Sequence, residues 1–375
     1  MKEIALYIHI PFCKQKCFYC DFPSYACKDK LMESYVDALC IEIKDKCKNY
    51  IIKTLFIGGG TPSYLDHNSL RKLMNTISEL RFTEDAEKTI ECNPGTVSKE
   101  KFEIIRKGGI NRLSFGLQTT NNELLKSIGR IHTFESFKEN YFLARSLGFE
   151  NINIDMMFGL PKQSVEEFIK GLREIVELKP EHISSYSLII EEGTAFYNLY
   201  EKDKLEVPSE EEERDMYREG KKFLEKNGYK QYEISNFSKD GKECRHNEVY
   251  WMCEEYLGVG VSASSFIDEK RVKNIDSIEE YIENINQGKS IVEEEYENTR
   301  EDDIEEFMFM GLRMNVGISE KKFKEKFGVD VDSIYKNVIN KNIKLGLLKR
   351  KCGTLYLSDL GIELSNSVMS DMILK

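Results

Sequence analysis

Three cysteines near the start of the chain have a spacing that suits a metal cluster. Cys13, Cys17 and Cys20 form a C-x3-C-x2-C pattern directly after the apolar run at residues 4–10. A four-iron cluster usually takes four protein thiolates, so three ligands leave one iron free to bind another molecule. Cys27 is the nearest candidate for a fourth ligand, but six intervening residues make a site that includes it less compact.

Other uses of cysteine fit the sequence less well. A structural zinc site calls for four ligands, usually in two separated pairs. Disulfides are rare in a reducing compartment, and the remaining cysteines are scattered. We therefore interpret Cys13, Cys17 and Cys20 as ligands of a [4Fe–4S] cluster with an open iron. A zinc site or plain structural thiols remain the alternatives.

A repeated strand–helix pattern in the first half of the chain would position this site. Strand-like runs occupy residues 4–10, 54–59, 88–93, 111–118, 151–160 and 182–190. Segments with helical periodicity lie between them, at residues 30–47, 67–80, 99–107, 133–147 and 164–178. Six such alternations predict an α/β fold with a parallel sheet, curved into a partial (β/α)6 barrel. In such folds the loops after the strands carry the chemistry.

Three regions follow from changes in this pattern. Residues 1–190 form the predicted barrel, and residues 191–295 form an extension that contains a loop with the sequence CRHNEVYW. Residues 296–375 read as three helices and a hairpin that turns near Cys352 and Gly353, which is typical of a winged-helix-like domain. Such domains often bind DNA, but a net charge of −11 argues against a nucleic-acid partner.

The composition also bears on location. No stretch reaches the roughly 18 apolar residues that a membrane span requires, and MKEIALYIHI does not read as a signal peptide. We therefore expect a cytoplasmic protein without a transmembrane segment.

The motifs together resemble a known superfamily. The cysteine motif, with Tyr19 before its last cysteine, resembles that of radical S-adenosylmethionine (SAM) proteins. The segments YIHIPFC, GGGTP, ECNP, SFGLQT, GR and DMMFGLPKQ follow the order of the family that contains oxygen-independent coproporphyrinogen III oxidase and its relatives. In that superfamily the open iron is chelated by the amino and carboxylate groups of SAM. The resemblance covers nearly the whole chain.

This resemblance implies a set of SAM contacts. Glu91 is suited to accept from an ammonium group, and Arg130 to hold a carboxylate by two hydrogen bonds. Gln118 and Asp155, expected at the ends of the fourth and fifth strands, suit ribose hydroxyls. Carried over by position, the full set is Tyr7, Tyr19, Gly59, Gly60, Thr61, Glu91, Gln118, Arg130 and Asp155.

A second motif indicates heme. The stretch from His246 to Trp251, HNEVYW, resembles the signature of HemW-type heme chaperones. A neutral imidazole can ligate heme iron, so the resemblance predicts His246 as ligand, with Tyr250 and Trp251 covering the macrocycle. Arg245 could pair with a propionate. Cys244 and Cys253 are alternative axial ligands, and the plain alternative is that His246 and Trp251 pack a loop onto the barrel mouth.

Two functions remain open from the sequence. The first is a chaperone that binds heme and transfers it to apo-proteins, with a [4Fe–4S] cluster and SAM as cofactors. The second is an oxygen-independent coproporphyrinogen III oxidase, an enzyme that decarboxylates porphyrinogen propionates. The oxidases carry a further cysteine where this chain has Phe22, and an N-terminal extension before the first strand, so we favour the chaperone. The loop at residues 258–265 lacks a histidine usual in the chaperones, which leaves the second axial ligand open.

Overall fold

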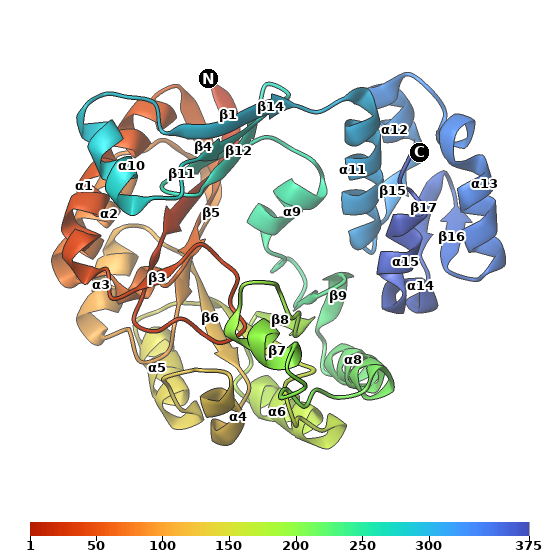
Figure 1. Ribbon diagram of the computed structural model, residues 1–375, viewed down its shortest axis with the longest axis horizontal. Coiled ribbons are helices and arrows are strands. Elements are labelled where there is room, and N and C mark those ends of the chain that lie inside the picture. Colours follow the sequence, from red (N-terminus) through yellow and green to blue (C-terminus); the bar gives the residue numbers. More distant parts are fainter. Residues whose placement is uncertain (375) are drawn as a thin grey trace.

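The predicted strand–helix alternation builds the centre of the protein. The computed structural model describes residues 1–374 (Figure 1). Its central strands are β1 (Lys2–Ile10), β4 (Tyr50–Gly59), β5 (Phe82–Cys92), β6 (Arg112–Gln118), β7 (Asn151–Phe158) and β8 (His182–Ser187). They lie side by side in this order and pair in parallel. The sheet curves but does not close, because other strands extend both of its edges. The predicted α/β partial barrel is confirmed.

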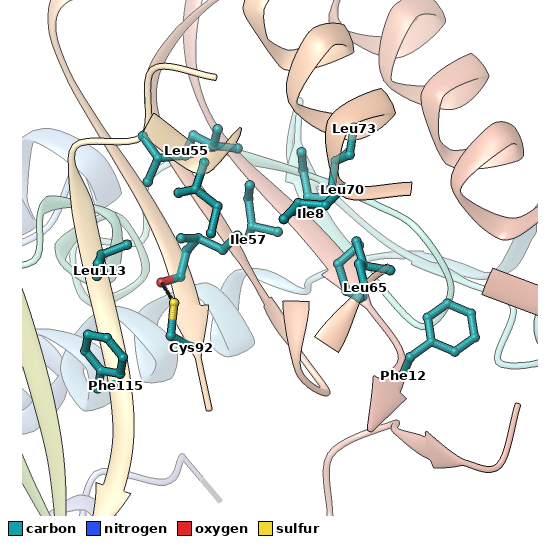
Figure 2. Packing of buried hydrophobic residues seen from close by; sticks show 14 of the residues in the cluster. Ile8, Phe12, Leu55, Ile57, Leu65, Leu70, Leu73, Cys92, Leu113 and Phe115 are labelled. Carbon is teal, nitrogen blue, oxygen red and sulfur yellow. Dashed lines mark hydrogen bonds between the residues drawn. The ribbon is translucent and has the colours of Figure 1, made fainter. Parts of the chain in front are cut away.

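Helices cover the outer face of this sheet. They are α1 (Met32–Cys47), α2 (His67–Ser78), α3 (Lys99–Lys107), α4 (Asn122–Ser127), α5 (Phe134–Ser146) and α6 (Val165–Glu177). Alternate residues of the strands, such as Leu55, Ile57 and Leu113, are fully buried in the core that includes these helices (Figure 2). Because side chains alternate across a strand, the other half of each strand faces the barrel interior.

The inner face of the sheet is mostly polar. The parallel register places Glu91 beside Ser114, and Ser114 beside Asn153. Asp155 in turn pairs with Ser184 on β8. A row of polar groups inside a barrel adds no hydrophobic stabilisation, so this face is where a functional site is expected.

The extension adds strands to both edges of the same sheet. Beyond β8 lie β10 (Asn236–Ser238) and β9 (Lys230–Glu233), both antiparallel. Beyond β1 lies β11 (Tyr256–Val259), which is parallel to it, followed by the antiparallel strands β12 (Ser264–Ile267), β13 (Lys270–Asn274) and β14 (Val292–Glu297). Apolar residues of the extension join the barrel core, including those on α8 (Glu210–Lys226) and α10 (Ile278–Asn286).

The predicted heme-motif loop is a helix, and the expectation of a loop is wrong. α9 (Arg245–Trp251) covers almost the whole motif. Its N-cap residue Cys244 makes no side-chain capping bond. Instead, the Glu87 carboxylate on β5 accepts from the His246 backbone N–H at 3.2 Å. A partner distant in sequence thus supplies the cap, which local pattern could not reveal.

The C-terminal region has its own core. It contains α11 (Arg300–Arg313), α12 (Glu320–Phe327) and α13 (Val331–Lys344), then a hairpin of β16 (Leu348–Lys351) and β17 (Thr354–Leu357). The predicted three helices and hairpin are confirmed, and the structure adds β15 (Ile318–Ser319), α14 (Asp359–Glu363) and α15 (Ser365–Ser370). α9 lies between the sheet and α11 (Figure 1). Among the described residues, no helix has the length and apolar character needed to cross a membrane.

Candidate functional site

The cysteine loop is held at the carboxyl ends of the strands. It runs between the short strands β2 (Phe12–Cys13) and β3 (Tyr25–Ala26). The Phe18 N–H donates to the Ile128 carbonyl at 3.1 Å, and the Phe18 carbonyl accepts from Phe196 at 2.9 Å. Phe196 belongs to α7 (Ala195–Tyr200) of the extension. The loop is therefore fixed from both sides before any ligand binds.

The three thiols line one cavity of about 140 Å³. Burial raises the pKa of the Cys13 and Cys20 thiols. The buried Ser24 hydroxyl lines the same cavity and has no hydrogen-bond partner. Within residues 1–374, no three histidine, cysteine or acidic side chains converge closely enough to hold a single metal ion. Thiols set around a cavity suit a group larger than one ion, and the exposed Cys27 does not line it.

Two glycines bring the end of β4 against this loop. Gly59 has φ of 108°, a conformation that side chains rarely allow, and its N–H donates to Glu91 Oε2 at 3.2 Å. A Cβ atom on Gly60 would lie 2.8 Å from the Phe12 carbonyl oxygen. Both positions therefore require glycine, and both line the cavity.

Two buried carboxyl groups face the cavity from β5 and β7. Burial, and to a lesser extent the nearby Asp155 charge, raise the pKa of Glu91 to about 8. Burial also raises the pKa of Asp155, although the Asn153 amide, which donates at 2.7 Å, opposes this shift. Glu91 is thus largely protonated at neutral pH, and a cationic ligand beside it would favour its ionised form.

Arg130 and Gln118 complete the wall. Arg130 Nη1 lies 3.4 Å from Cys17 Sγ, and Nη2 donates to Asn93 Oδ1 at 3.1 Å and to the Gly116 carbonyl. Gln118 accepts from the Tyr186 hydroxyl at 2.9 Å. The structure brings the predicted SAM residues together around this cavity, except Tyr7, which lines the next one.

A second cavity of about 270 Å³ adjoins the first. The residues that line both are Phe22, Gly59, Glu91, Ser114 and Asp155. Tyr7, Phe56, His246 and Tyr250 line only the second. The two predicted sites therefore open onto adjoining parts of one barrel interior.

His246 reaches this interior from the opposite end of the strands. Its Nδ1 bonds Thr54 Oγ1 and its Nε2 bonds the Tyr250 hydroxyl, both at 2.9 Å. Thr54 precedes Gly59 by five residues on β4, which corresponds to about 16 Å along the strand. Burial lowers the pKa of His246 to about 3, so the imidazole is neutral.

Trp251 does not join His246 and Tyr250. It faces the C-terminal region, where the Arg313 guanidinium lies 4.4 Å from the centre of its ring. A separate, mostly apolar cavity of about 230 Å³ lies beside it, lined also by Met252, Phe307 and Met314. The two faces of α9 thus serve different parts of the protein.

Of the other predicted heme contacts, only Cys244 lines the second cavity. Arg245 is exposed, and its Nη1 donates to the carbonyl and the carboxylate of Asp85 at 2.8 and 3.0 Å. Cys244 is buried and lines the second cavity, whereas Cys253 does not.

Sequence reasoning missed several residues that line the two cavities. They are Phe22, Ser24, Asn93, Arg112, Ser114, Asn153, Tyr186 and Ser184. A signal for some of them was present: in RLSFGLQ, polar or small residues alternate with apolar ones, so Arg112 and Ser114 share the face of Gln118.

Comparison with known proteins agrees with this architecture. Residues 7–175 match the radical SAM superfamily, and residues 298–364 match the HemN C-terminal domain. The heme chaperone HemW of Bacillus subtilis is 40% identical over 97% of each chain, and that of Lactococcus lactis is 37% identical over 100% of this chain and 98% of its own.

A solved structure extends the likeness to the fold. Coproporphyrinogen III oxidase (HemN) from Escherichia coli superposes with a TM-score of 0.87 over 99% of this chain and 90% of its own. Its identity of 24% makes this a likeness of fold alone. The identity to the chaperones over nearly full length shows more: the chain belongs to the HemW family of heme chaperones, within the radical SAM superfamily.

Proposed function

We propose that the protein is a cytoplasmic heme chaperone that binds heme at α9 and passes it to apo-proteins. The observation that carries this proposal is the position of His246, a neutral imidazole on the wall of an interior cavity. Neutral imidazole is a common axial ligand of heme iron. The cavity adjoins the cysteine cavity, so one interior holds both sites.

The cysteine cavity is lined by the side-chain types that a [4Fe–4S] cluster with SAM on its open iron would need. Cys13, Cys17 and Cys20 would hold the cluster, and the unpartnered Ser24 hydroxyl is free to donate to it. Glu91 and Arg130 would orient the charged groups of SAM, with Gln118 and Asp155 near its ribose. The cluster supplies one-electron reduction when bound, while the surrounding residues hold and orient the cofactor.

Hydrogen bonds at His246 define how it would bind iron. If Nδ1 carries the proton and donates to Thr54, the Nε2 lone pair is the one that accepts from Tyr250. Iron would replace the Tyr250 hydroxyl at Nε2, while Thr54 would keep the required tautomer. Heme binding therefore requires Tyr250 to move.

The test compares two buried histidines. His182 is also buried, and its Nε2 bonds the Tyr232 hydroxyl at 2.8 Å, but it does not line the second cavity. We expect His246→Ala to weaken heme binding at least about tenfold, whereas His182→Ala changes it little. The amount of heme bound per chain is measured after gel filtration by the absorbance of its pyridine complex. Ligation of the iron is followed by electron paramagnetic resonance.

Two results would contradict the proposal. Equal heme binding and spectra in wild type and His246→Ala would place the ligand elsewhere, with Cys244 the first alternative. Decarboxylation of coproporphyrinogen III at a catalytic rate, under anaerobic reducing conditions, would favour the oxidase.

A further inference from the structure

Arg112 on β6 is a buried cation whose charge has no direct partner. Its side chain lines the second cavity, and the residue is only 1% exposed. Its Nε has no hydrogen-bond partner. Within residues 1–374, no carboxylate oxygen lies within the 4.0 Å of its nitrogens that defines an ion pair. Buried arginines are almost always paired, so this one calls for an explanation.

Two partly buried arginines show what pairing looks like in this protein. Arg130 is hydrogen-bonded to Asn93 and to the Gly116 carbonyl. Arg145 contacts the Tyr141 hydroxyl and forms an ion pair of 2.7 Å with Glu181. Arg112 lacks such contacts although it is more deeply buried than either Arg130 or Arg145.

The acids nearest to Arg112 are already engaged. Glu87 accepts from the His246 N–H at 3.2 Å and from the Cys244 thiol at 3.7 Å, so it caps α9. Asp155 accepts from the Asn153 amide. Burial opposes the charge on Arg112, but interactions with Cys244, Glu87 and other nearby acidic groups outweigh it and raise its pKa. The guanidinium therefore stays charged beside the cavity.

We infer that Arg112 is a carboxylate anchor for the ligand that enters the second cavity. A guanidinium holds a carboxylate by two parallel hydrogen bonds, which Arg112 has free nitrogens to make. The inference rests on the proposed function, in which the ligand is heme and the carboxylate is a propionate. Arg112 and His246 line the same cavity, so one ligand can contact both.

The structure favours Arg112 over the arginine that the sequence suggested. Arg245 is exposed and paired with Asp85, and it does not line the cavity. The cavity, at about 270 Å³, is smaller than the roughly 300–1,000 Å³ of pockets that enclose drug-sized ligands. Heme binding at His246 therefore requires this cavity to widen, which the proposed movement of Tyr250 away from His246 would allow.

The test compares heme with its dimethyl ester, in which both propionates are neutral. We expect the wild-type protein to bind heme at least about tenfold more tightly than the ester. Arg112→Gln should lose this preference, and Arg112→Lys should keep part of it. The control Arg245→Gln should behave as wild type. Affinities are measured by fluorescence quenching, with circular dichroism to verify the fold of each variant.

Other results would contradict either the role of Arg112 or heme binding itself. A wild-type protein that binds both compounds equally, or Arg112→Gln with an unchanged preference, would overturn the inference while leaving heme binding intact. A wild-type protein that binds neither would contradict the proposed function itself.

The carboxylate of SAM offers the same chemistry, so a second arm uses SAM and its decarboxylated analogue. If Arg112→Gln removes the preference for SAM but keeps the preference for heme, the assignment to a propionate is overturned. If it removes only the heme preference, the assignment is supported.

Discussion

The two ends of the barrel interior are prepared for their ligands in different ways. At the cysteine end, Ser24 Oγ and Arg130 Nε are buried without partners, and Gly59 and Gly60 hold the backbone close to the cavity. At the α9 end, both ring nitrogens of His246 are already bonded within the protein. The cysteine end is thus preorganised, whereas heme binding at the α9 end, as proposed above, would exchange an internal hydrogen bond for the ligand.

This difference bears on how tightly each ligand is kept. A preorganised site loses little free energy to rearrangement, as suits a resident cofactor. A site closed by its own hydrogen bonds restores those bonds when the ligand leaves. Such a site suits cargo that must be released to another protein.

The largest expected effect is at the cysteine end. Changing Cys13, Cys17 and Cys20 to alanine together should abolish the cluster, because no cysteine remains on the cavity wall except Cys92. Iron and sulfide analysis should give near zero iron against about four per chain in wild type. Cys27→Ala is the control, since Cys27 lies outside the cavity. Full iron content in the triple variant would show that the cluster lies elsewhere, and the contrast between the cysteine end and the α9 end would then fail.

The next effect concerns Glu91 and pH. Its pKa of about 8 in the folded protein exceeds the ordinary 4.5, so the folded state binds a proton that the unfolded state has lost between these values. As pH rises across this window, the free energy of unfolding of the wild type should therefore fall relative to that of Glu91→Gln, by up to about 1.4 kcal/mol per pH unit. Below pH 4.5 the difference should be constant.

Thermal unfolding of cluster-free wild type and Glu91→Gln, from pH 5 to 9, measures this effect. A difference in melting temperature that does not change with pH would show that Glu91 is ionised in the empty site.

Trp251 tests whether the two faces of α9 are independent. Because its ring packs against Arg313 of α11, Trp251→Ala should destabilise the protein by about 2 kcal/mol, less than for a fully buried tryptophan. Heme binding should weaken far less than in His246→Ala. Calorimetric unfolding and heme titration measure the two quantities. A loss of heme equal to that of His246→Ala, without a loss of stability, would return Trp251 to the heme site.

The smallest expected effect concerns the hydrogen bond by which Tyr250 occupies His246. Tyr250→Phe removes the hydroxyl that occupies His246 Nε2 but keeps the ring. Heme affinity should rise by roughly twofold to tenfold, the worth of a typical net hydrogen bond of about 0.5–1.5 kcal/mol. Thr54→Val is the matched change at the other nitrogen, and it should not raise affinity. A lower affinity in Tyr250→Phe would mean that this hydroxyl assists the ligand.

Sequence pattern predicted the parts of the fold that local physics determines. The helix expected at residues 99–107 is α3, because Ser98 caps its first turn and apolar residues recur at helical spacing. Glu91 and Gln118 lie at strand ends as expected. These predictions depend on residues that are near one another in the chain. The prediction that Asp155 ends a strand is wrong, because β7 continues for three residues beyond it.

The features that sequence pattern did not predict depend on contacts between distant segments of the chain. Residues 292–297, VEEEYE, form the edge strand β14, in which every residue is exposed, so no apolar face marked it as a strand. The direction of Trp251 depends on α11, which is about 50 residues further on. The free charge of Arg112 could not be predicted either, because it follows from Glu87 being engaged by α9.

The pairing of β1 with β11 has a consequence for biosynthesis. Tyr7 lies opposite Gly258, so the first strand made by the ribosome gains its second neighbour only after Val259 has been synthesised. Domains generally fold from the N-terminus during synthesis at about 5–20 residues per second. One side of β1 therefore stays unpaired for more than ten seconds of translation, next to the cysteines that we propose as cluster ligands. Nascent chains stalled before and after residue 259 should differ sharply in protease resistance at their N-terminus.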